Sequence, residues 1–568
     1  MDRNIVVNLG EQRFDRLIEE NKFYIDKTEF IREWWEYGST VTLITRPRRF
    51  GKTLNMSMLE CFFSNQYAGR GDLFETLSIW KDTSASGDNK YRHLQGSYPV
   101  IFLSFASVKT GNIDGIKKAV KGIISDAYKS RKHIMKSDLF DEDDRTAFTA
   151  VNCKMDDDTA YTALRSLCSY LAKYYNKDVI IILDEYDTPM QEAWLEGNWD
   201  KAITFFRNIF HNTFKTNPHL QRGMITGITR ITKESIFSDL NNLDVITTTS
   251  NEYATAFGFT EEEVFAALDA ADLGSEKQEV KRWYDGFTFG RYTDIYNPWS
   301  IASFISKKGT YKTYWANTSS NGLVNSLIQR GNSDIKQMME DLMLGKSIAA
   351  EIDEQIAFHQ LDNNINAVWS LLLSTGYLKV LQAETDPGRY TLALTNLEVK
   401  KMFRKMISEW FNDGTQIYYN EFINALLADN IRKMNTFMNK VALNTFSSFD
   451  SGNKPSEQAE PERFYHGFVL GMVVNLADTY RVRSNRESGF GRYDVMLEPI
   501  DRKQKAFIFE FKVLDPDEDE ATLEDTLANA HAQIEEKQYE AELVSKGFLP
   551  EQIRKYGFAF KGKTCLIG

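Results

Sequence analysis

Residues 41–59 read VTLITRPRRFGKTLNMSML, and this stretch decides how the first half of the chain is interpreted. A run of β-branched and apolar residues leads into a basic loop that ends in Gly51-Lys52-Thr53, and helix-permissive residues follow. Strand, loop and helix in this order are the setting of a Walker A phosphate-binding loop. Backbone N–H groups at the helix start would hold phosphate oxygens, Lys52 would neutralise the β and γ phosphates, and the Thr53 hydroxyl would bind Mg²⁺.

A second apolar run supplies the other half of a nucleotide site. Residues 179–183 read VIIIL and end in Asp184-Glu185, the Walker B pattern. Because ligands bind at the carboxyl ends of parallel strands, Asp184 would hold Mg²⁺, and Glu185 would position or deprotonate the attacking water. Taken singly, the first pattern also fits a surface turn, with Arg46 in place of the usual first glycine, and the second fits solvated acids. Together they predict ATP binding.

Alternation of short apolar runs with longer amphipathic segments predicts an α/β domain with a mainly parallel sheet. A capping box at Thr260-Glu261-Glu262-Glu263 predicts a helix start that opens a lid or helical extension. The predicted strands are 41–45, 99–105, 179–183, 222–228 and 245–248.

The pattern changes twice further along the chain. From about residue 296 to about 445 it is mostly helical, and residues 371–378 suggest a small winged-helix-like unit. Residues 447–461, SSFDSGNKPSEQAEP, lack apolar periodicity and predict an interdomain linker. A compact α/β unit is predicted after it, with a helix at 464–477, strands near 480–484, 493–497 and 506–511, a helix around 528–543 and a strand near 557–560.

The last unit carries a second group of chemistry-bearing residues. Asp494 lies near the start of one predicted strand, and Glu510 and Lys512 lie two apart on the next, so those two share a face. A hairpin turn near residues 501–504 would bring Asp494 beside Glu510. Two converging carboxylates make an oxygen-ligand site for Mg²⁺, and Lys512 would activate water or stabilise developing charge. A solvated strand face is the alternative, but residues 506–509 are apolar, and buried charges require partners.

Composition excludes several classes of protein. The 568 residues include 68 basic and 80 acidic ones, and the net charge of -12 disfavours a chain coated in basic charge for nucleic-acid binding. A local groove remains compatible with that charge, because four arginines surround the second group: Arg481, Arg483, Arg486 and Arg492. An exposed arginine-rich strand is the competing explanation.

The cysteines and the apolar runs predict the compartment. No apolar run of about 20 residues and no leader-like start is present, which disfavours membrane spanning and secretion. Scattered cysteines suit reduced thiols in a cytoplasmic protein, and they are Cys61, Cys153, Cys168 and Cys565.

Several motifs together resemble the AAA-ATPase-like proteins that carry a C-terminal PD-(D/E)XK nuclease domain. In that family an Arg-Pro-Arg-Arg-Phe-Gly-Lys-Ser/Thr loop is the usual Walker A form, so Arg46 resembles a family trait. The pattern departs from the nuclease motif at its proline, because Tyr493 precedes Asp494. The motifs that carry the resemblance are FYIDKT at 23–28, RPRRFGKT at 46–53, GITR at 227–230, NNL at 241–243, WYDG at 283–286 and YNPWS at 296–300.

The sequence patterns and the resemblance together predict an order of domains. Residues 1–290 would form an AAA-like, P-loop (ASCE) parallel-sheet ATPase domain with the start of a lid, and residues 291–446 a helical, winged-helix-like middle region. Residues 447–461 would be the linker, and residues 462–568 an α/β PD-(D/E)XK nuclease-like domain.

The resemblance also implies roles for single residues. Thr226 or Thr229 would sense the γ-phosphate, and Arg230 would supply positive charge there. The nuclease core would be Asp494, Glu510 and Lys512, with Glu487 and Gln533 as accessory residues and Arg492 nearby. The phosphate loop would contribute Arg48, Arg49, Phe50, Gly51, Lys52 and Thr53, with Arg48 or Arg49 facing phosphate or a neighbouring subunit.

The sequence therefore predicts an ATP-binding and hydrolysing protein coupled to a Mg²⁺-dependent phosphodiesterase that acts on nucleic acid, with DNA the expected substrate. The alternative is a nucleotide-gated interaction or regulatory switch whose C-terminal domain binds nucleic acid or protein without cleaving it. An arginine supplied by a neighbouring subunit would require a homo-oligomer.

Overall fold

The chain folds into two compact units, each assembled from separate segments. Unit 1 comprises Met1–Ser319, Ala350–Tyr390 and Thr395–Glu398, and unit 2 comprises Ser320–Ala349, Thr391–Leu394 and Val399–Gly568. For some of the described residues, including 485–488 and 491–493, only the backbone is described. The computed structural model describes residues 7, 9–81, 89–229, 236–237, 240–315, 324–325, 327–328, 333–353, 365–386, 388–409, 415–449, 468–469, 471–488, 491–515 and 520–568.

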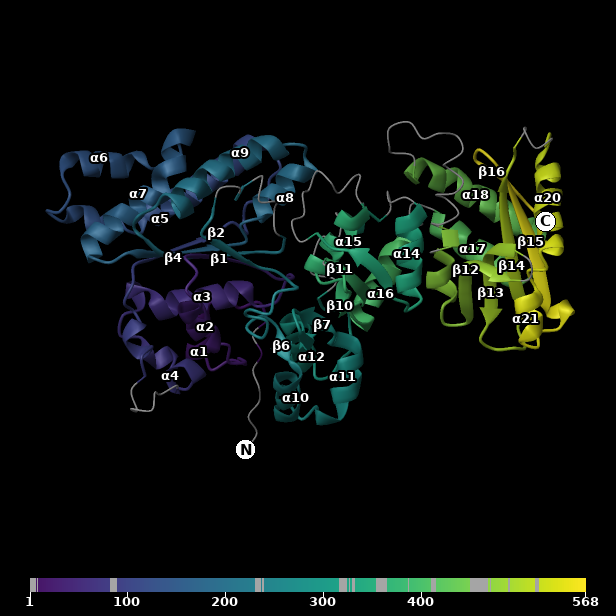
Figure 1. Cartoon of the computed structure of the whole chain (residues 1–568), viewed down its shortest axis with the longest axis horizontal. Helices are drawn as coiled ribbons and strands as arrows, with labels where there is room; N and C mark the ends of the chain where they lie inside the picture. Colours follow the sequence, from purple (N-terminus) through teal and green to yellow (C-terminus); the bar gives the residue numbers. More distant parts are fainter. Residues whose placement is uncertain are drawn as a thin grey trace. The chain divides into compact units, whose positions relative to one another are not determined.

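A five-stranded parallel sheet forms the centre of the N-terminal part of unit 1 (Figure 1). Its order is β2-β3-β4-β1-β5, which places β4 between the two strands that carry the Walker motifs. All five predicted strands are confirmed, with ends shifted by at most a few residues. They are β1 (Val41–Thr45), β2 (Val100–Ser104), β3 (Val179–Asp184), β4 (Leu220–Gly227) and β5 (Leu243–Ile246).

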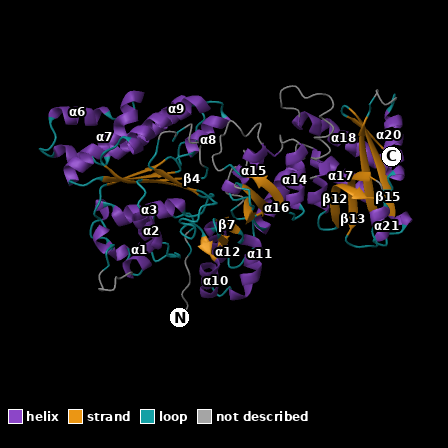
Figure 2. Cartoon of the chain, viewed as in Figure 1, coloured by secondary structure: helices purple, strands orange, loops and turns teal. Residues whose placement is uncertain are grey.

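Helices cover both faces of this sheet, which explains why β1 and β3 are buried along their whole length. Figure 1 shows the helices α1 to α4 on one face and α5 to α9 on the other, and Figure 2 shows the same layers by element type. They are α1 (Phe14–Glu19), α2 (Glu29–Tyr37), α3 (Lys52–Phe63), α4 (Ser78–Lys81), α5 (Ile113–Lys129), α6 (Glu142–Ala150), α7 (Asp157–Tyr175), α8 (Thr188–Leu195) and α9 (Trp199–Phe210).

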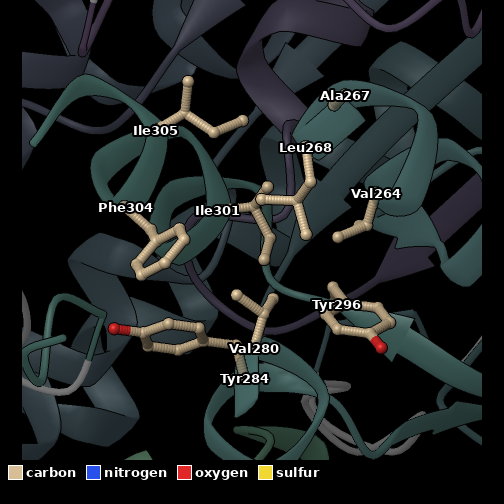
Figure 3. Close-up of a cluster of buried hydrophobic side chains, with 9 residues drawn as sticks. All are labelled: Val264, Ala267, Leu268, Val280, Tyr284, Tyr296, Ile301, Phe304 and Ile305. Atoms are coloured by element: carbon tan, nitrogen blue, oxygen red, sulfur yellow. The ribbon is translucent and has the colours of Figure 1, made fainter. Parts of the chain in front are cut away.

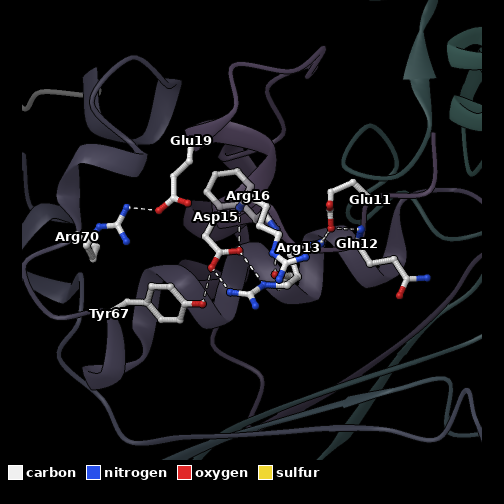
Figure 4. A network of polar contacts seen from close by, with 10 residues as sticks. Glu11, Gln12, Arg13, Asp15, Arg16, Glu19, Tyr67 and Arg70 are labelled. Atoms are coloured by element: carbon white, nitrogen blue, oxygen red, sulfur yellow. Dashed lines mark hydrogen bonds and ion pairs between the residues drawn. The ribbon is translucent and has the colours of Figure 1, made fainter. Parts of the chain in front are cut away.

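Helix α1 is fixed by polar contacts as well as by its apolar face (Figure 4). The carboxylate of Asp15 accepts hydrogen bonds from the Arg13 guanidinium and from the Tyr67 hydroxyl, the latter at 3.0 Å. Arg70 donates to Glu19 at 2.7 Å. These contacts hold the start of the chain to the segment that follows α3.

The segment after β5, which was expected to open a lid and is called the lid below, has its own apolar core (Figure 3). The predicted capping box is confirmed: the Thr260 hydroxyl accepts from the Glu263 N–H, and the Glu263 carboxylate accepts from the Thr260 N–H at 2.8 Å. Leu268, Tyr284 and Phe304 are among the fully buried side chains between its helices. The lid elements are β6 (Phe259–Thr260), α10 (Glu261–Ala270), α11 (Lys277–Tyr284), β7 (Phe287–Phe289), β8 (Tyr292–Tyr296) and α12 (Pro298–Ser306).

The described residues from 307 to 449 are largely helical, as predicted for about 296–445, but they also include three short strands that the sequence did not indicate. Strand β9 is only four residues long and alternates buried with exposed positions, so it gives no extended apolar run. The elements are α14 (Ser333–Met343), β9 (Ile348–Glu351), α15 (Ile365–Ser374), β10 (Leu378–Ala383), β11 (Arg389–Leu394), α16 (Leu397–Glu409), α17 (Thr415–Leu427) and α18 (Ile431–Phe449).

A mixed five-stranded sheet forms the centre of unit 2, in the order β12-β13-β14-β15-β16. Only the pair β14–β15 is parallel. The predicted strands are confirmed, and β16 is an additional one. The elements are β12 (Tyr480–Ser488), β13 (Gly491–Pro499), β14 (Ala506–Val513), α20 (Leu523–Glu536), α21 (Ala541–Ser545), β15 (Ile553–Lys561) and β16 (Thr564–Ile567).

The helix predicted around 528–543 is wrong in its bounds. It begins earlier because Thr522 and Asp525 form a capping box, and it ends at Glu536 because the chain turns at Gln538, whose φ is +50°. The predicted helix at 464–477 is helical at its described positions, 468–469 and 471–476, and its start lies outside the described residues.

No helix within the described ranges combines the length and the apolar character needed to cross a membrane.

Candidate nucleotide and carboxylate sites

The phosphate loop joins β1 to α3 at the carboxyl edge of the parallel sheet. Gly51 has φ +79° and caps α3, and Arg49 has φ +65°. No heavy atom lies within 4 Å of the position a Gly51 Cβ would take, so glycine is required there by the backbone conformation rather than by crowding. The loop therefore presents the first backbone N–H groups of α3 at the sheet edge, as a phosphate site needs.

Lys52 is buried at the base of this loop. Its ammonium donates to the backbone carbonyls of Arg46 and Pro47 at 2.9 and 2.8 Å. Burial lowers the pKa of Lys52, and the acidic side chains that follow β3, Glu185 foremost, act in the opposite direction. The positive charge is thus held in place between the loop and the end of β3.

Asp184, at the end of β3, connects α3 and β4 through its two carboxylate oxygens. One accepts from the Thr53 hydroxyl at 2.8 Å, and the other accepts from the Thr226 hydroxyl at 2.5 Å. Asp184 is fully buried, and this burial raises its pKa while the two hydroxyl donors lower it. A hydroxyl and a carboxylate in contact at this edge are a donor set that suits Mg²⁺.

Glu185 follows Asp184 in a left-handed conformation, with φ +53°. Such a conformation is costly for a residue other than glycine, and it is concentrated at functional sites. The Glu185 carboxylate accepts from the Thr188 hydroxyl at 3.1 Å, and its backbone N–H donates to the Thr226 hydroxyl at 3.4 Å. The turn therefore holds the half-buried Glu185 side chain beside Asp184 and the end of β4.

Arg46 takes the place of the first glycine for a structural reason. Its side chain is fully buried, and the guanidinium donates to the carbonyls of Thr45, Thr247 and Glu252. It also stacks on the Phe289 ring, 4.4 Å from the ring centroid. Arg46 thus ties the base of the phosphate loop to the segment that follows β5 and to the lid.

The next three loop residues also contact neighbouring elements. The Phe50 ring is buried against Phe287 and Phe289, with centroids 4.8 and 5.5 Å apart, so only its backbone remains for the predicted nucleotide contact. The Arg49 guanidinium lies 4.3 Å from the Trp299 ring centroid. Arg48 donates to the Gln191 amide oxygen at 3.4 Å.

The predicted sensor residues are only partly described. Thr226 meets Asp184, as reported above, whereas the Thr229 hydroxyl donates to Asp187 at 3.1 Å. Arg230 lies outside the described residues. Asp187 is a fully buried acid that the sequence interpretation did not single out. The sequence feature that could have drawn attention to Asp187 is a third acidic residue just after the strand, in Asp184-Glu185-Tyr186-Asp187.

The carboxylate site of unit 2 lies where β13 and β14 pair. Val495 is opposite Phe509 in the antiparallel register, so Asp494 precedes that pair on one strand and Glu510 follows it on the other. The Asp494 carboxylate accepts a hydrogen bond from the Phe511 N–H at 2.8 Å. The predicted hairpin therefore brings these two carboxylates onto neighbouring strands.

Glu510 is the buried member of this pair, with 3% of its surface exposed. One carboxylate oxygen accepts from the Gln533 amide, which also lies 2.9 Å from the Tyr539 hydroxyl. The other oxygen is buried and has no hydrogen-bond partner among the residues that the structure describes. Burial and the nearby charge of Asp494 raise the pKa of Glu510 to about 8, and Lys512 lowers it in part.

The donor set fits a divalent cation. Two carboxylates on adjacent strands, one with an unpartnered buried oxygen, leave negative charge that a hard cation with oxygen ligands would neutralise. Lys512 is half-buried two residues beyond Glu510 on the same face of β14. The position of Lys512 lets it act next to the two carboxylates.

The structure describes the side chains of only some of the accessory residues. Gln533, expected as an accessory residue, donates to the Glu510 carboxylate. Glu487 and Arg492 are paired in the register of β12 and β13, but their side chains lie outside the described set. Arg483 forms ion pairs with Glu498, at 3.0 Å, and with Glu542. It is therefore already neutralised within the protein.

Comparisons with known proteins assign both parts of the chain. Residues 8–237 match the family described as Predicted AAA-ATPase, and residues 460–568 match the PD-(D/E)XK nuclease superfamily. The chain is also similar to an uncharacterized protein from the vnfD 5′ region of Azotobacter chroococcum mcd 1, at 25% identity over 524 residues, or 89% of each chain. The resemblance inferred from the motifs is confirmed: the N-terminal part of this chain belongs to the predicted AAA-ATPase-like family, and its C-terminal part to the PD-(D/E)XK nuclease superfamily.

Proposed function

We propose that the protein binds and hydrolyses ATP and that it is also a Mg²⁺-dependent phosphodiesterase acting on nucleic acid, with DNA as the substrate. One observation carries the phosphodiesterase half: Glu510 has a buried, unpartnered carboxylate oxygen beside Asp494 on the neighbouring strand. The ATPase half rests on the contact of Thr53 and Thr226 with Asp184.

In the nucleotide site, each residue has a distinct task. Backbone N–H groups at the start of α3 bind the phosphates, and the Lys52 ammonium neutralises their charge. Thr53 and Asp184 would hold Mg²⁺. Glu185 orients the attacking water from its strained turn, and Thr226 keeps Asp184 and Glu185 aligned.

In the carboxylate site, Asp494 and Glu510 would hold Mg²⁺, which supplies Lewis-acid charge at the scissile phosphate when bound. Gln533 fixes the orientation of the Glu510 carboxylate. Lys512 places a positive charge where the phosphodiester gains negative charge during attack by water.

The nucleotide half is tested by Lys52→Ala, with the exposed Lys118→Ala as the matched control. Loss of the ammonium removes a charge-assisted contact to phosphate, so ATP affinity in a calorimetric titration should fall by about tenfold or more. Lys118→Ala should bind as the unaltered protein does. Equal ATP affinity in Lys52→Ala would remove the basis for this half.

The nuclease half is tested with Asp494→Asn and Lys512→Ala on single-stranded and double-stranded DNA and RNA, with Mg²⁺ present, with and without ATP. The exposed Lys503→Ala is the control. We expect cleavage of DNA by the unaltered protein and by the control, and a loss of about 100-fold or more in each site variant. Binding of nucleic acid without cleavage under every condition would favour a non-cleaving binding domain instead.

A further inference from the structure

A fully buried carboxylate lies next to the nucleotide site, and the chemistry proposed above does not use it. Asp187 directly precedes α8 and lies three residues after Asp184. One of its oxygens accepts from the backbone N–H groups of Ile228 and Thr229, both at 3.0 Å, and from the Thr229 hydroxyl at 3.1 Å. The carboxylate therefore fixes the chain directly after β4, within three residues of Thr226.

The end of β4 packs closely against the turn formed by Tyr186 and Asp187. A Cβ on Gly227 would lie 2.6 Å from the Tyr186 ring and 2.9 Å from the Asp187 carboxylate. The Tyr186 N–H donates to the Thr226 carbonyl, and its hydroxyl donates to the Thr229 carbonyl, both at 2.9 Å. A shift of Asp187 would therefore displace the strand end that carries Thr226.

Gln191 connects the same carboxylate to the phosphate loop. It lies one turn after Asp187 on α8, and its amide nitrogen donates to the Asp187 carboxylate at 2.9 Å. Its amide oxygen accepts from the Arg48 guanidinium at 3.4 Å. The two ends of one side chain thus join the phosphate loop to the end of β4 through Asp187.

The buried Asp187 carboxylate and its contacts connect two parts of the nucleotide site. Burying a carboxylate is costly, and burial indeed raises the pKa of Asp187, against its backbone hydrogen bonds. The same series of contacts begins at Arg48, one of the two loop arginines expected to face phosphate or a neighbouring subunit, and ends beside the Thr226 hydroxyl, which contacts both Asp184 and Glu185.

We propose that Asp187 and Gln191 are positioning residues for ATP hydrolysis, which link Arg48 in the phosphate loop to the strand end that aligns Thr226 with Asp184 and Glu185. The inference rests on the proposed ATPase function and deepens it. Because the link acts on the alignment of Asp184 and Glu185 rather than on phosphate contacts, its loss should lower turnover and leave nucleotide affinity nearly unchanged.

Two variants of Gln191 test the link without removing the buried carboxylate. Gln191→Leu removes both contacts, whereas Gln191→Glu keeps an acceptor for Arg48 and places a second negative charge against Asp187. Gln66→Leu, at an exposed glutamine, is the control. Full-length proteins are compared for the Kd of ATP and ADP, for kcat and KM of phosphate release, and for thermal midpoint.

We expect kcat to fall by about tenfold or more in both Gln191 variants, with the Kd of ATP within about threefold of the unaltered protein. Unchanged kcat in both variants would overturn the link while leaving the ATPase proposal intact, as would a Kd that rises in step with the loss of kcat/KM. Absence of turnover in the unaltered protein would overturn the ATPase proposal and the link together. Asp187→Asn should lower kcat as well, and a normal kcat in that variant would also overturn the link.

Discussion

Arg46 occupies the position at which a Walker A loop ordinarily has glycine, and its side chain gives a reason for the substitution. The guanidinium is buried against three backbone carbonyls and the Phe289 ring, so it anchors the loop from below. Glycine would leave these carbonyls without a donor and would leave a cavity beside the lid.

Arg46→Gly should therefore lower the stability of the protein, although it restores the usual Walker A motif. We expect a loss of about 2–4 kcal/mol in the free energy of unfolding, from the lost buried hydrogen bonds and packing, and weaker ATP binding. Denaturant unfolding and nucleotide titration check both effects. Arg291→Gly, at an exposed turn, should change neither, and a more stable Arg46→Gly protein would contradict the anchoring role.

The sequence predicted only those contacts of the site that follow directly from the order and direction of the strands. Parallel strands place their carboxyl ends together, so the approach of Thr53 to Asp184 follows from two sequence motifs. Asp187 could not be distinguished from a solvated acid, because nothing in the sequence shows that the end of β4 covers it. Phe50 was expected at the nucleotide, but its packing partners lie more than 200 residues further along the chain.

At the scale of elements, the lid carries a compact acidic group. Carboxylate oxygens of Glu261, Asp285 and Asp294 lie within 4.8 Å of one another, and the Lys281 ammonium forms ion pairs with all three. One lysine offsets only part of this charge. Burial, followed by the charge of Asp294, raises the pKa of Asp285 to about 7.

This raised pKa makes the stability of the folded protein depend on pH, in a known direction. The folded protein keeps a proton on Asp285 up to about pH 7, whereas the unfolded chain releases it near 3.8, so its contribution to stability is full at low pH and is lost as the pH rises toward 7. Asp285→Asn should remove this loss. Calorimetric midpoints at pH 5 and pH 8 measure it, and Glu262→Gln, at an exposed acid, should keep the normal pH dependence.

The outer edge of the unit 2 sheet is closed by side chains. Asn435 and Asn439 on α18 each donate to and accept from the backbone of β16, at Ile567 and Cys565 respectively, with distances of 2.7 to 2.9 Å. Each asparagine side chain thus forms with β16 the pair of hydrogen bonds that a neighbouring strand would form. An edge left open would be free to pair with another chain.

The double variant Asn435→Ala, Asn439→Ala should therefore be less stable, by about 1–3 kcal/mol for each backbone pair left unsatisfied, and should self-associate. Denaturant unfolding and light scattering after size exclusion would measure the two effects. Asn424→Ala, at an exposed asparagine on α17, is the control. A double variant that stays monomeric at every concentration tested would contradict the edge-closing role.

Element prediction succeeded for the buried apolar runs and missed several of the short strands. The buried strands β1 and β3 were recognisable because both faces are covered. Strands β9 and β16 have four residues each, too few for a periodic signal. The bounds of α20 depend on a capping box whose acid is Asp525 rather than Glu or Gln.

At the scale of the whole molecule, unit 2 extends well before the predicted start of its nuclease-like domain at residue 462. Phe422 on α17 packs against Phe468 and Phe558, with centroids 5.3 and 6.5 Å apart. Asp429 accepts from Lys505 at 2.8 Å and from Arg554 at 2.6 Å. Helices α17 and α18 thus supply one side of the core of unit 2.

A fragment of residues 462–568 should therefore not fold cooperatively, whereas residues 320–568, which contain both helices and every other segment of unit 2, should. Near-UV circular dichroism and urea unfolding distinguish the two, because only a packed core gives a sharp transition. A cooperative transition in the shorter fragment would show that the strands and α20 suffice without these helices.

The division of the chain into units has a consequence for how the gene can be rearranged. The chain passes from one unit to the other five times, after residues 319, 349, 390, 394 and 398, and the segment 447–461 lies inside unit 2. Recombination at a single junction could therefore not transfer all the segments of the nuclease-like unit to another ATPase. Any exchange would have to carry the 320–349 and 391–394 segments with it, so the AAA-ATPase-like part and the nuclease-superfamily part would be inherited together.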